Sequence, residues 1–365
     1  MPLTCLIKNA TNIDIMPKGN SKDLITFKPK EVGKKLLGLL PERARDILTK
    51  RYGLGKNAEH LTLEAIGGEY GITRERVRQI ENFALNGIKK SAEFPKFEVI
   101  FDELKQVMND FGGVVHEVEF LNALAKDKSS QNHIHFLLVI SEAFSKLKED
   151  EDFHHRWTTD KNFATRIHKS LTNLCTNLSE KDLVSETQLL DSFLVELKDI
   201  ADTARGREKE MARRWITLSK SLNQNPLGEW GLSKSPNVRM RGIRDYAFLV
   251  LRQHGSPMHF NEVAKGIEKL FGKVAHPATC HNELIKDKRF VLVGRGLYAL
   301  AEWGYNPGVV ADVIRSILKK ESPLTKDEII ARVMKERYVK ENTILVNLQN
   351  PKLFKKDSQS RYSIA

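Results

Sequence analysis

Apolar residues recur at helical spacing within the stretch GITRERVRQIENFALNGIKK, Gly71 to Lys90. At about 100° per residue, one side of a helix over this stretch collects Val77, Ile80, Ala84 and Ile88. The opposite side collects Arg74, Glu75, Arg78, Gln79 and Asn82. This clean separation of apolar and polar positions predicts an amphipathic helix with one buried and one solvent-facing side.

A shorter helix is predicted directly upstream, from Thr62 to Tyr70, in LTLEAIGGEYGI. Gly71 follows at a point where a positive φ angle costs little, and Thr73 fits the N-cap position of the second helix. Two helices joined by such a turn predict a helix-turn-helix. In that motif the second helix lies in the major groove of DNA, and its first two turns reach the base edges.

The side chains of those two turns suit base recognition. Arginine can bind guanine O6 and N7 together, glutamate can accept from cytosine N4, and glutamine can pair with adenine or reach a phosphate. A solvated, salt-bridged surface helix is the alternative, since Glu75 with Gln79 and Arg74 with Arg78 are ordinary i,i+4 neighbours. The preceding helix and glycine turn favour DNA binding.

Residues 32–90 resemble region 4 of the primary sigma factors, the sigma-70 class. The resemblance rests on EVGKKLLGLLPERARDILTKRYGL followed by LTLEAIGGEYGITRERVRQIENFAL, and it covers about a sixth of the chain. It implies recognition of the minus-35 promoter element in double-stranded DNA. It also implies binding to the β-flap of the bacterial RNA polymerase core.

The same resemblance implies roles for individual residues. The expected DNA-binding residues are Thr73, Arg74, Glu75, Arg76, Arg78, Gln79, Asn82, Lys89 and Lys90. Among them, the base and backbone readers sit in the first two turns, while Thr73 and Arg76 brace the helix or touch phosphate. The helix from Pro41 to Arg51 would face the polymerase through Ile47, Leu48 and Arg51, although its apolar residues also suit the small core of the domain.

The segment before this module departs from a full sigma factor. Region 2 of that family captures the unpaired minus-10 strand with aromatic side chains, whereas residues 1–31 contain a single aromatic, Phe27. We therefore expect that the chain does not open promoters by itself. Residues 1–31 are predicted to be an N-terminal extension, partly disordered.

Composition limits the remaining possibilities. The chain has 365 residues, of which 41% are hydrophobic and 29% charged, and this predicts several small cores rather than one. We expect a cytoplasmic protein without a membrane partner, because no long apolar run or signal peptide is visible. Cys5, Cys175 and Cys280 lie far apart, so neither a disulfide framework nor a zinc site is indicated, and no cofactor is expected.

Positive charge is concentrated at the two ends of the chain. The whole chain has a formal net charge of +12. Lysine and arginine outnumber acidic residues over 34–90, 236–305 and 306–365, whereas acidic residues are in excess over 91–152. Phosphate binding needs local positive potential, so the basic segments are candidates for nucleic-acid contact. The acidic segment is more typical of a protein contact or a spacer.

The C-terminal part contains an internal repeat. SPMHFNEVAKGI from Ser256 aligns with SPLTKDEIIARV from Ser322, and the following RFVLVGRGLYAL aligns with LFKKDSQSRYSI. Each copy predicts three helices and a two-stranded hairpin, which together make a winged helix. The predicted helices cover 241–253, 261 onward and 277–286 in one copy, and 309–319, 325 onward and 340–349 in the other. The copy at 240–304 also resembles the HARE-type helix-turn-helix, which implies a role with nucleic acid or in a transcription complex.

Weaker versions of the same template are predicted in the middle of the chain. Residues 94–158 and 160–235 are interpreted as degenerate winged helices, the first of them acidic, with recognition helices at 132–148 and 208–222. The stretch NPLGEWGLSKSPNVRMRG, 225–242, is the best linker candidate. A second C-terminal winged helix is expected at 306–365.

The predicted fold is therefore mainly α, a sigma region 4-like helix-turn-helix followed by an array of winged helices with small β-hairpin wings. The main hypothesis is a non-catalytic DNA-binding regulator of bacterial transcription, associated with RNA polymerase. A structural adaptor that binds proteins through its winged helices is the alternative. A third hypothesis, an enzyme subunit that targets DNA modification or cleavage, is not supported by any catalytic motif in the sequence. The histidines lack zinc-enzyme spacing. Oligomeric state and target promoters stay open.

Overall fold

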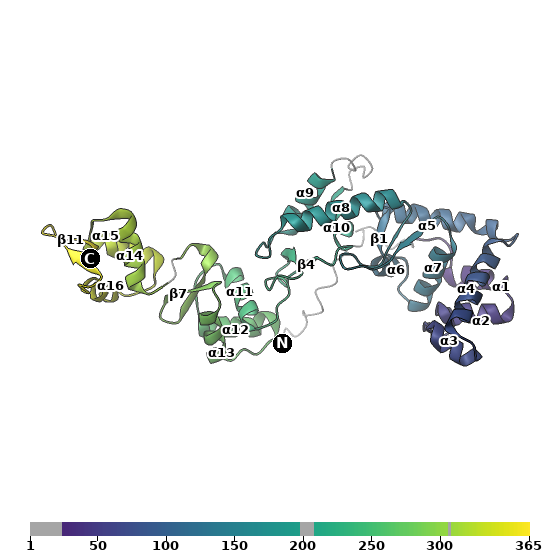
Figure 1. Ribbon diagram of the computed structural model, residues 1–365, viewed down its shortest axis with the longest axis horizontal. Helices are drawn as coiled ribbons and strands as arrows, with labels where there is room; N and C mark the ends of the chain where they lie inside the picture. Colours follow the sequence, from purple (N-terminus) through teal and green to yellow (C-terminus); the bar gives the residue numbers. More distant parts are fainter. Residues whose placement is uncertain (1–23, 198–207, 306–307) are drawn as a thin grey trace, which may run out of the picture. The chain divides into compact units, whose positions relative to one another are not determined.

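The computed structural model describes residues 24–197, 208–305 and 308–365 (Figure 1). These residues form two compact units, each described by itself below. The N-terminal unit contains residues 24–197, 208–223 and 230–233, and the C-terminal unit contains 224–229, 234–305 and 308–365. No helix in the described part of the chain is long and apolar enough to cross a membrane.

The predicted helix-turn-helix is present at the start of the N-terminal unit. It consists of α3 (Leu63–Tyr70) and α4 (Arg74–Lys89). Two further helices precede it, α1 (Pro29–Gly38) and α2 (Glu42–Arg51). Thr62 caps α3 by accepting from the Ala65 amide, and Gly71 adopts the left-handed conformation with φ of 64°. Thr73 then caps α4, as the sequence predicted. We call residues 29–90 the sigma-like module.

The turn between α3 and α4 is tight because Gly67 has no side chain. A Cβ atom at Gly67 would lie 2.5 Å from the Ile72 carbonyl oxygen and 3.5 Å from the Arg74 nitrogen. Any larger residue would push α4 away from α3. The angle at which α4 is presented therefore depends on this glycine.

Four winged helices follow across the described residues, built on the order helix, strand, helix, helix, strand, strand. The first is α5 (Glu98–Asp110), β1 (Val114–His116), α6 (Glu117–Leu124), α7 (Lys128–Ile140), β2 (Ser145–Leu147) and β3 (Arg156–Thr158), preceded by the short helix η1 (Phe94–Phe97). Its sheet order is β1-β3-β2, all antiparallel. The degenerate copy predicted at 94–158 thus has the complete template.

The second copy reduces its first strand to one residue. Its elements are α8 (Lys161–Asn177), α9 (Glu186–Glu196), α10 (Glu208–Ile216), β4 (Leu222–Gln224) and β5 (Trp230–Leu232). Val184 makes an isolated antiparallel bridge with Trp230, in the place that the first strand occupies in the other copies. β4 and β5 form the hairpin.

The C-terminal unit holds the two copies found as a repeat. The third is α11 (Ile243–His254), β6 (Met258–His259), α12 (Phe260–Phe271), α13 (Pro277–Lys286), β7 (Phe290–Gly294), β8 (Leu297–Leu300) and η3 (Ala301–Trp303). The fourth is α14 (Val310–Glu321), β9 (Leu324–Thr325), α15 (Lys326–Glu336), α16 (Glu341–Leu348), β10 (Phe354–Lys356) and β11 (Arg361–Ile364). Both sheets repeat the order of the first copy, and Thr325 with Glu328 forms the predicted capping box.

Two boundary predictions were wrong. The third helix of the first copy ends at Ile140, and residues 145–147 of its predicted range form β2 instead. The predicted helix 208–222 ends at Ile216, since Leu222 begins β4. The chain passes from the N-terminal to the C-terminal unit within the predicted linker 225–242, which also contains β5 and the buried side chains of Asn225, Ser235, Asn237 and Val238.

The N-terminal extension was predicted as residues 1–31, of which 1–23 lie outside the described residues. Within the remainder, Ile25 is buried and α1 already begins at Pro29. Ile25 packs into a core that runs from the sigma-like module into the first winged helix. The chain from residue 24 onward is therefore an integral part of the N-terminal unit.

Candidate nucleic-acid interface

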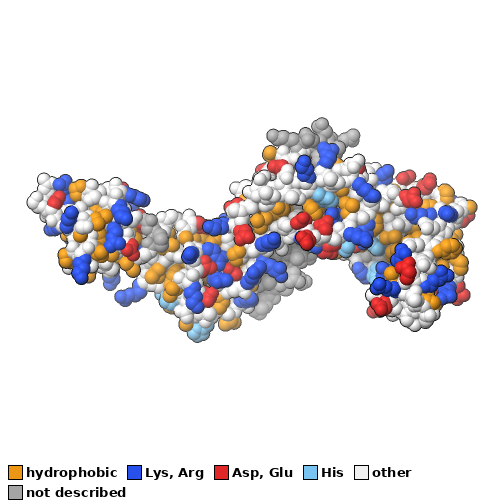
Figure 2. Space-filling model, in the orientation of Figure 1, with side chains coloured by type: hydrophobic (Ala, Val, Ile, Leu, Met, Phe, Trp, Pro, Cys, Tyr) orange, Lys and Arg blue, Asp and Glu red, His pale blue; other side chains and the backbone are white. Residues whose placement is uncertain are grey.

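Helix α4 separates its apolar and polar side chains as the periodicity predicted. Val77, Ala84 and Ile88 have no solvent-exposed surface. The expected DNA-contacting side chains in its first three turns are all exposed, namely Arg74, Glu75, Arg76, Arg78, Gln79 and Asn82. On the face of the protein drawn in Figure 2, basic side chains lie among acidic ones over the region of α2 to α4. The polar side of α4 is therefore open to solvent within the N-terminal unit.

The cap of α4 leaves part of its N-terminus open. The Thr73 hydroxyl accepts from the Arg76 amide at 3.2 Å, which satisfies one of the amides that a helix start leaves without a partner. Thr73 is itself exposed. The remaining amides and the helix dipole make this end of α4 attractive to a phosphate. Thr73 therefore lies where its side chain can hold the start of the helix next to a bound phosphate.

Two pairs of the expected DNA-contacting side chains bind each other. Arg78 forms a bidentate pair with Glu75, donating from Nε to Oε2 at 2.9 Å and from Nη2 to Oε1 at 2.6 Å. This hydrogen bonding holds the pKa of Glu75 below its ordinary value, so the carboxylate stays charged. Arg76 donates from Nη1 to Gln79 Oε1 at 3.0 Å. Both pairs fix long side chains that would otherwise sample many rotamers.

The two lysines at the end of α4 differ. Lys90 is exposed, whereas Lys89 is half-buried and lies 3.4 Å from Glu142, a residue of the first winged helix. Lys90 is therefore available to a phosphate. Lys89 already has an acidic neighbour, which weakens its net attraction for DNA.

The residues expected to face polymerase lie in different environments. Ile47 and Leu48 have no exposed surface, so they serve the core, which was the other interpretation of their pattern. Ile47 packs with Ile66 and Val77 and so holds α2, α3 and α4 together. Arg51 is half-buried and donates from Nη1 to the Leu61 carbonyl at 3.1 Å. Neither Ile47 nor Leu48 can touch a partner directly in this fold.

The outer side of α2 instead carries a polar groove. Its lining residues are Glu42, Arg43, Arg45, Asp46, Thr49 and Tyr70. The Arg43 guanidinium lies 5.4 Å and the Lys50 ammonium 5.2 Å from the centre of the Tyr70 ring, and Lys50 also pairs with Asp46 at 2.8 Å. Sequence reasoning missed this surface because its residues come from two helices that meet only in the fold.

Phe83 was also missed. Its side chain is 73% exposed, on the same side of α4 as Gln79 and Asn82. The helical periodicity could have found it, since it falls among polar positions. An apolar ring on a groove-facing helix can contact a thymine methyl group.

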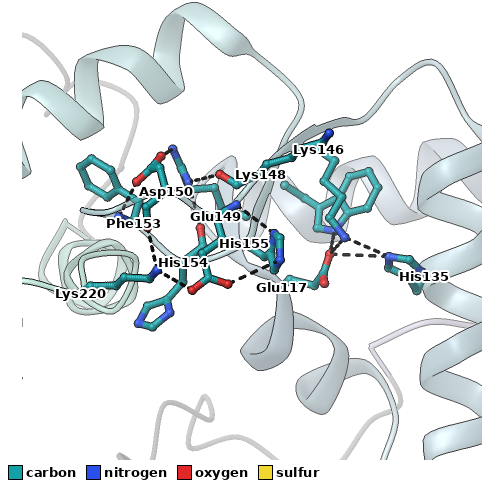
Figure 3. Close-up of polar contacts among 12 residues, drawn as sticks. Glu117, His135, Lys146, Lys148, Glu149, Asp150, Phe153, His154, His155 and Lys220 are labelled. Carbon is teal, nitrogen blue, oxygen red and sulfur yellow. Dashed lines mark hydrogen bonds and ion pairs between the residues drawn. The ribbon is translucent and has the colours of Figure 1, made fainter. Parts of the chain in front are cut away.

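Several histidines of the N-terminal unit take part in networks of polar side chains. Among the described residues no group of three or more His, Cys, Asp or Glu side chains could hold a metal ion. Figure 3 shows one such network, in which Glu117 accepts from Trp157 Nε1 at 2.7 Å and pairs with Lys146 at 2.6 Å. Burial lowers the pKa of the nearby His135 to about 4, so its ring is neutral at pH 7.

Residues 36–90 match the family model of sigma-70, region 4. Residues 242–303 match a second family model, the HARE-HTH domain, a helix-turn-helix described from restriction endonucleases among other proteins. The resemblances seen in the sequence are thus confirmed for both segments. Outside these two segments, the winged helices of the described chain are identified by their fold alone, from the order of their helices and small antiparallel sheets.

Curated relatives match over the first segment. The principal sigma factor HrdD of Streptomyces coelicolor is 46% identical over 63 residues, which are 17% of this chain and 19% of that protein. The sigma factor RpoD of Neisseria gonorrhoeae is 36% identical over 72 residues, 20% of this chain and 11% of that protein. The sigma factor sigA of Oryza sativa is 37% identical over 73 residues, 20% and 14%. The chain spans no more than a fifth of these relatives, and no solved structure matches it.

Proposed function

We propose that this protein is a sequence-specific, DNA-binding transcription regulator associated with bacterial RNA polymerase, and that it reads minus-35-like DNA through α4. The observation that carries the proposal is the exposed row of reading side chains on a capped helix of a helix-turn-helix. The match of residues 36–90 to sigma-70, region 4, supports the choice of DNA element. We propose no catalytic step and no cofactor.

Each reading residue has a proposed task. Arg74 and Arg78 donate to guanine, and Glu75 accepts from cytosine N4. Because Glu75 already holds Arg78, the two side chains act as one unit that presents donors and acceptors together. Gln79 and Asn82 extend the contact by another turn, while Lys90 binds phosphate and carries no sequence information.

Association with polymerase is the second half of the proposal. The relatives' names describe RNA polymerase sigma factors, and the matched segment is a small part of each of them. Since Ile47 and Leu48 are buried, we propose that the polymerase contact of α2 involves Arg51 and the groove next to Tyr70. Such a mixed-charge groove suits a polar, charged partner surface. The β-flap is the part of polymerase that we propose as this partner.

A structural adaptor is the competing candidate, and one observation favours it. The third helix of the first winged helix, α7, packs against α1 of the sigma-like module, so this template binds protein here. An adaptor would bind duplex DNA with little sequence preference, because a basic surface contacts mainly the phosphates. A reader would instead discriminate single base pairs by about 1 to 3 kcal/mol each.

Selection of duplexes from a randomised library by the full-length protein, at fixed salt, separates these candidates. A reader should enrich a defined minus-35-like motif, and its Arg74→Ala and Glu75→Ala variants should enrich altered motifs. The Asn86→Ala variant, at an exposed position beyond the main reading row, serves as a matched control on the same helix. Enrichment of no motif by the wild type would favour the adaptor.

Retention of core polymerase by the immobilised full-length protein tests the second half of the proposal. The wild type should retain polymerase, and charge reversal at Arg43 or Arg45 in the groove should reduce retention. Reversal at Lys288, an exposed residue of the C-terminal unit, is the control. Competition by an isolated β-flap fragment then asks which part of polymerase is bound. Failure of the folded wild type to retain polymerase would remove this half of the proposal.

A further inference from the structure

The third helix of the first winged helix, α7, is covered by protein on most of its surface. Of its thirteen residues eight are buried, and its exposed residue is Lys128. The buried residues include three polar ones, Gln131, Asn132 and His133. In helix-turn-helix proteins this is the helix that enters DNA. Here it lies against α1 of the sigma-like module (Figure 1).

The contact is part of one continuous core. Apolar side chains of the sigma-like module and of α7 belong to the same cluster, among them Leu36, Leu40, Tyr52, Leu54, Ala84 and Ile88 from the module and Ile134, Phe136 and Leu137 from the first winged helix. The rings of Tyr52 and Phe136 meet edge to face with centres 5.4 Å apart. Without α7, the module would expose a contiguous apolar surface, and amphipathic helices bind surfaces of this kind.

Hydrogen bonds fix α7 at one position on this apolar surface. The Asn132 amide, 2% exposed, donates from Nδ2 to the carbonyl oxygens of Gly53 and Ala58, both at 2.9 Å. Its Oδ1 lies 2.9 Å from His60 Nε2. Gly33 gives the His133 ring room to pack against α1, since a Cβ atom at Gly33 would overlap that ring. These polar groups and the glycine thus match the two surfaces to each other.

The second winged helix repeats the arrangement. Trp215 of α10 is 2% exposed and donates from Nε1 to the Gly112 carbonyl of the first copy at 3.0 Å. The guanidinium of Arg214, also buried, lies 4.0 Å from the centre of the Phe111 ring. Thr217, just after α10, donates to Glu119 at 2.7 Å. The third helix of the second copy therefore contacts the first copy, as α7 contacts the module.

We propose that α7 and α10 are docking helices, each bound to the preceding domain, and that neither reads DNA. On this proposal α4 is the DNA-reading helix of the N-terminal unit, and the apolar surface of the sigma-like module under α7 is closed to any helix of a partner. The part of it that concerns partners rests on the proposed function. Polymerase must then be contacted through another surface of the module while α7 stays in place.

A larger side chain between α1 and α7 tests the docking of α7 in the absence of DNA and polymerase. Gly33→Ala adds a methyl group that collides with His133, whereas Gly38→Ala, on the same helix, meets no atom within 4 Å. Hydrogen exchange of the full-length protein, read by mass spectrometry on peptides covering 128–140, should be about tenfold faster or more in G33A. It should be unchanged in G38A. Equal exchange in both variants would overturn the docking of α7.

Removal of the ring provides a second variant. His133→Ala makes room for the methyl group, so exchange in the G33A/H133A double variant should be no faster than in H133A alone. Additive effects would mean that Gly33→Ala acts on α1 alone and would overturn the contact. This comparison uses only H133A and the double variant, so it stays valid if G33A alone is strongly destabilised.

The same exchange measurement with ligands tests the consequences. Adding the duplex selected from the library should protect peptides covering 73–82 and leave 128–140 and 208–216 unchanged. Adding core polymerase should also leave 128–140 unchanged. DNA-dependent protection of α7 or α10, or loss of protection in α7 on adding polymerase, would overturn the proposal. Absence of any protection by DNA or polymerase would instead count against the proposed function, and the comparison of G33A with G38A would still decide docking.

Discussion

Asn132→Ala should loosen the sigma-like module from the first winged helix. The change removes the amide that donates to the carbonyls of Gly53 and Ala58 and that contacts His60. It leaves the apolar core of the contact intact. The expected result is local opening around residues 52–60 and 128–140, with the remaining winged helices unaffected.

The size of the effect depends on what replaces each lost partner. Gly53 is buried, so its carbonyl oxygen is left unsatisfied, at a cost of about 1 to 3 kcal/mol. Ala58 is half-buried and can recover part of its hydrogen bond from water, so its loss costs about 0.5 to 1.5 kcal/mol. His60 is exposed and contributes little. Together these losses amount to about 1.5 to 4.5 kcal/mol.

Native-state hydrogen exchange at increasing urea concentration measures this quantity region by region. The free energy of opening should fall by the stated amount on peptides covering 52–60 and 128–140. Peptides from α13 and α16 act as an internal reference, because they belong to the C-terminal unit. Asn86→Ala, at an exposed position of α4, should change the opening free energy by less than about 0.5 kcal/mol.

A loss below about 0.5 kcal/mol in Asn132→Ala would refute this account, since that value is typical of a surface substitution. An equal loss in both units would also contradict it, because the hydrogen bonds of this amide lie within the N-terminal unit. A loss confined to the two named regions would support both the contact and its proposed docking role.

Three further predictions concern α4 and two half-buried histidines, His135 and His168. Arg74→Ala or Glu75→Ala should change the preferred duplex by about 1 to 3 kcal/mol at single base pairs, measured by library selection and by binding curves on the selected sites. Lys90→Ala should instead weaken binding to all duplexes alike and lower the salt slope of log K by about 1, measured by titration at several salt concentrations. The N-terminal unit should lose stability as the pH falls from about 6.5 to about 4, because burial lowers the folded-state pKa of His135 and His168 to about 4 and the unfolded chain takes up these protons first. Urea midpoints at pH 7 and pH 5 check this, and His168→Gln should reduce the loss.

The helix-turn-helix could be predicted from sequence because its signals are local. Thr62 and Thr73 are N-caps, Gly71 supplies the left-handed turn, and the apolar positions of α4 have helical period. Each of these signals lies within a few residues of the structure that it specifies. The same holds for the repeat at 240–365, where two copies of one pattern support each other.

The docking of α7 could not be predicted in this way. The run Phe136 to Ile140 indicates a buried helix, but it does not say which surface covers it. The partner surface comes from Tyr52, Leu54 and α1, far away in the sequence, and Asn132 is polar. A polar residue at a buried position is recognisable as a docking residue only when its partners are known. The burial of Ile47 and Leu48 shows the same limit, since an apolar side of a helix can face a partner or a core.

The separation of the two sides of α4 affects how the protein can diverge. Val77, Ala84 and Ile88 support the fold, while the side chains of the proposed reading row, Arg74, Glu75, Arg78 and Gln79, project into solvent. Substitutions in the reading row therefore carry almost no folding penalty. On the proposed function, descendants of this chain can acquire new DNA targets in single steps without first gaining stability, so the base preference of α4 can change while its buried side stays constrained.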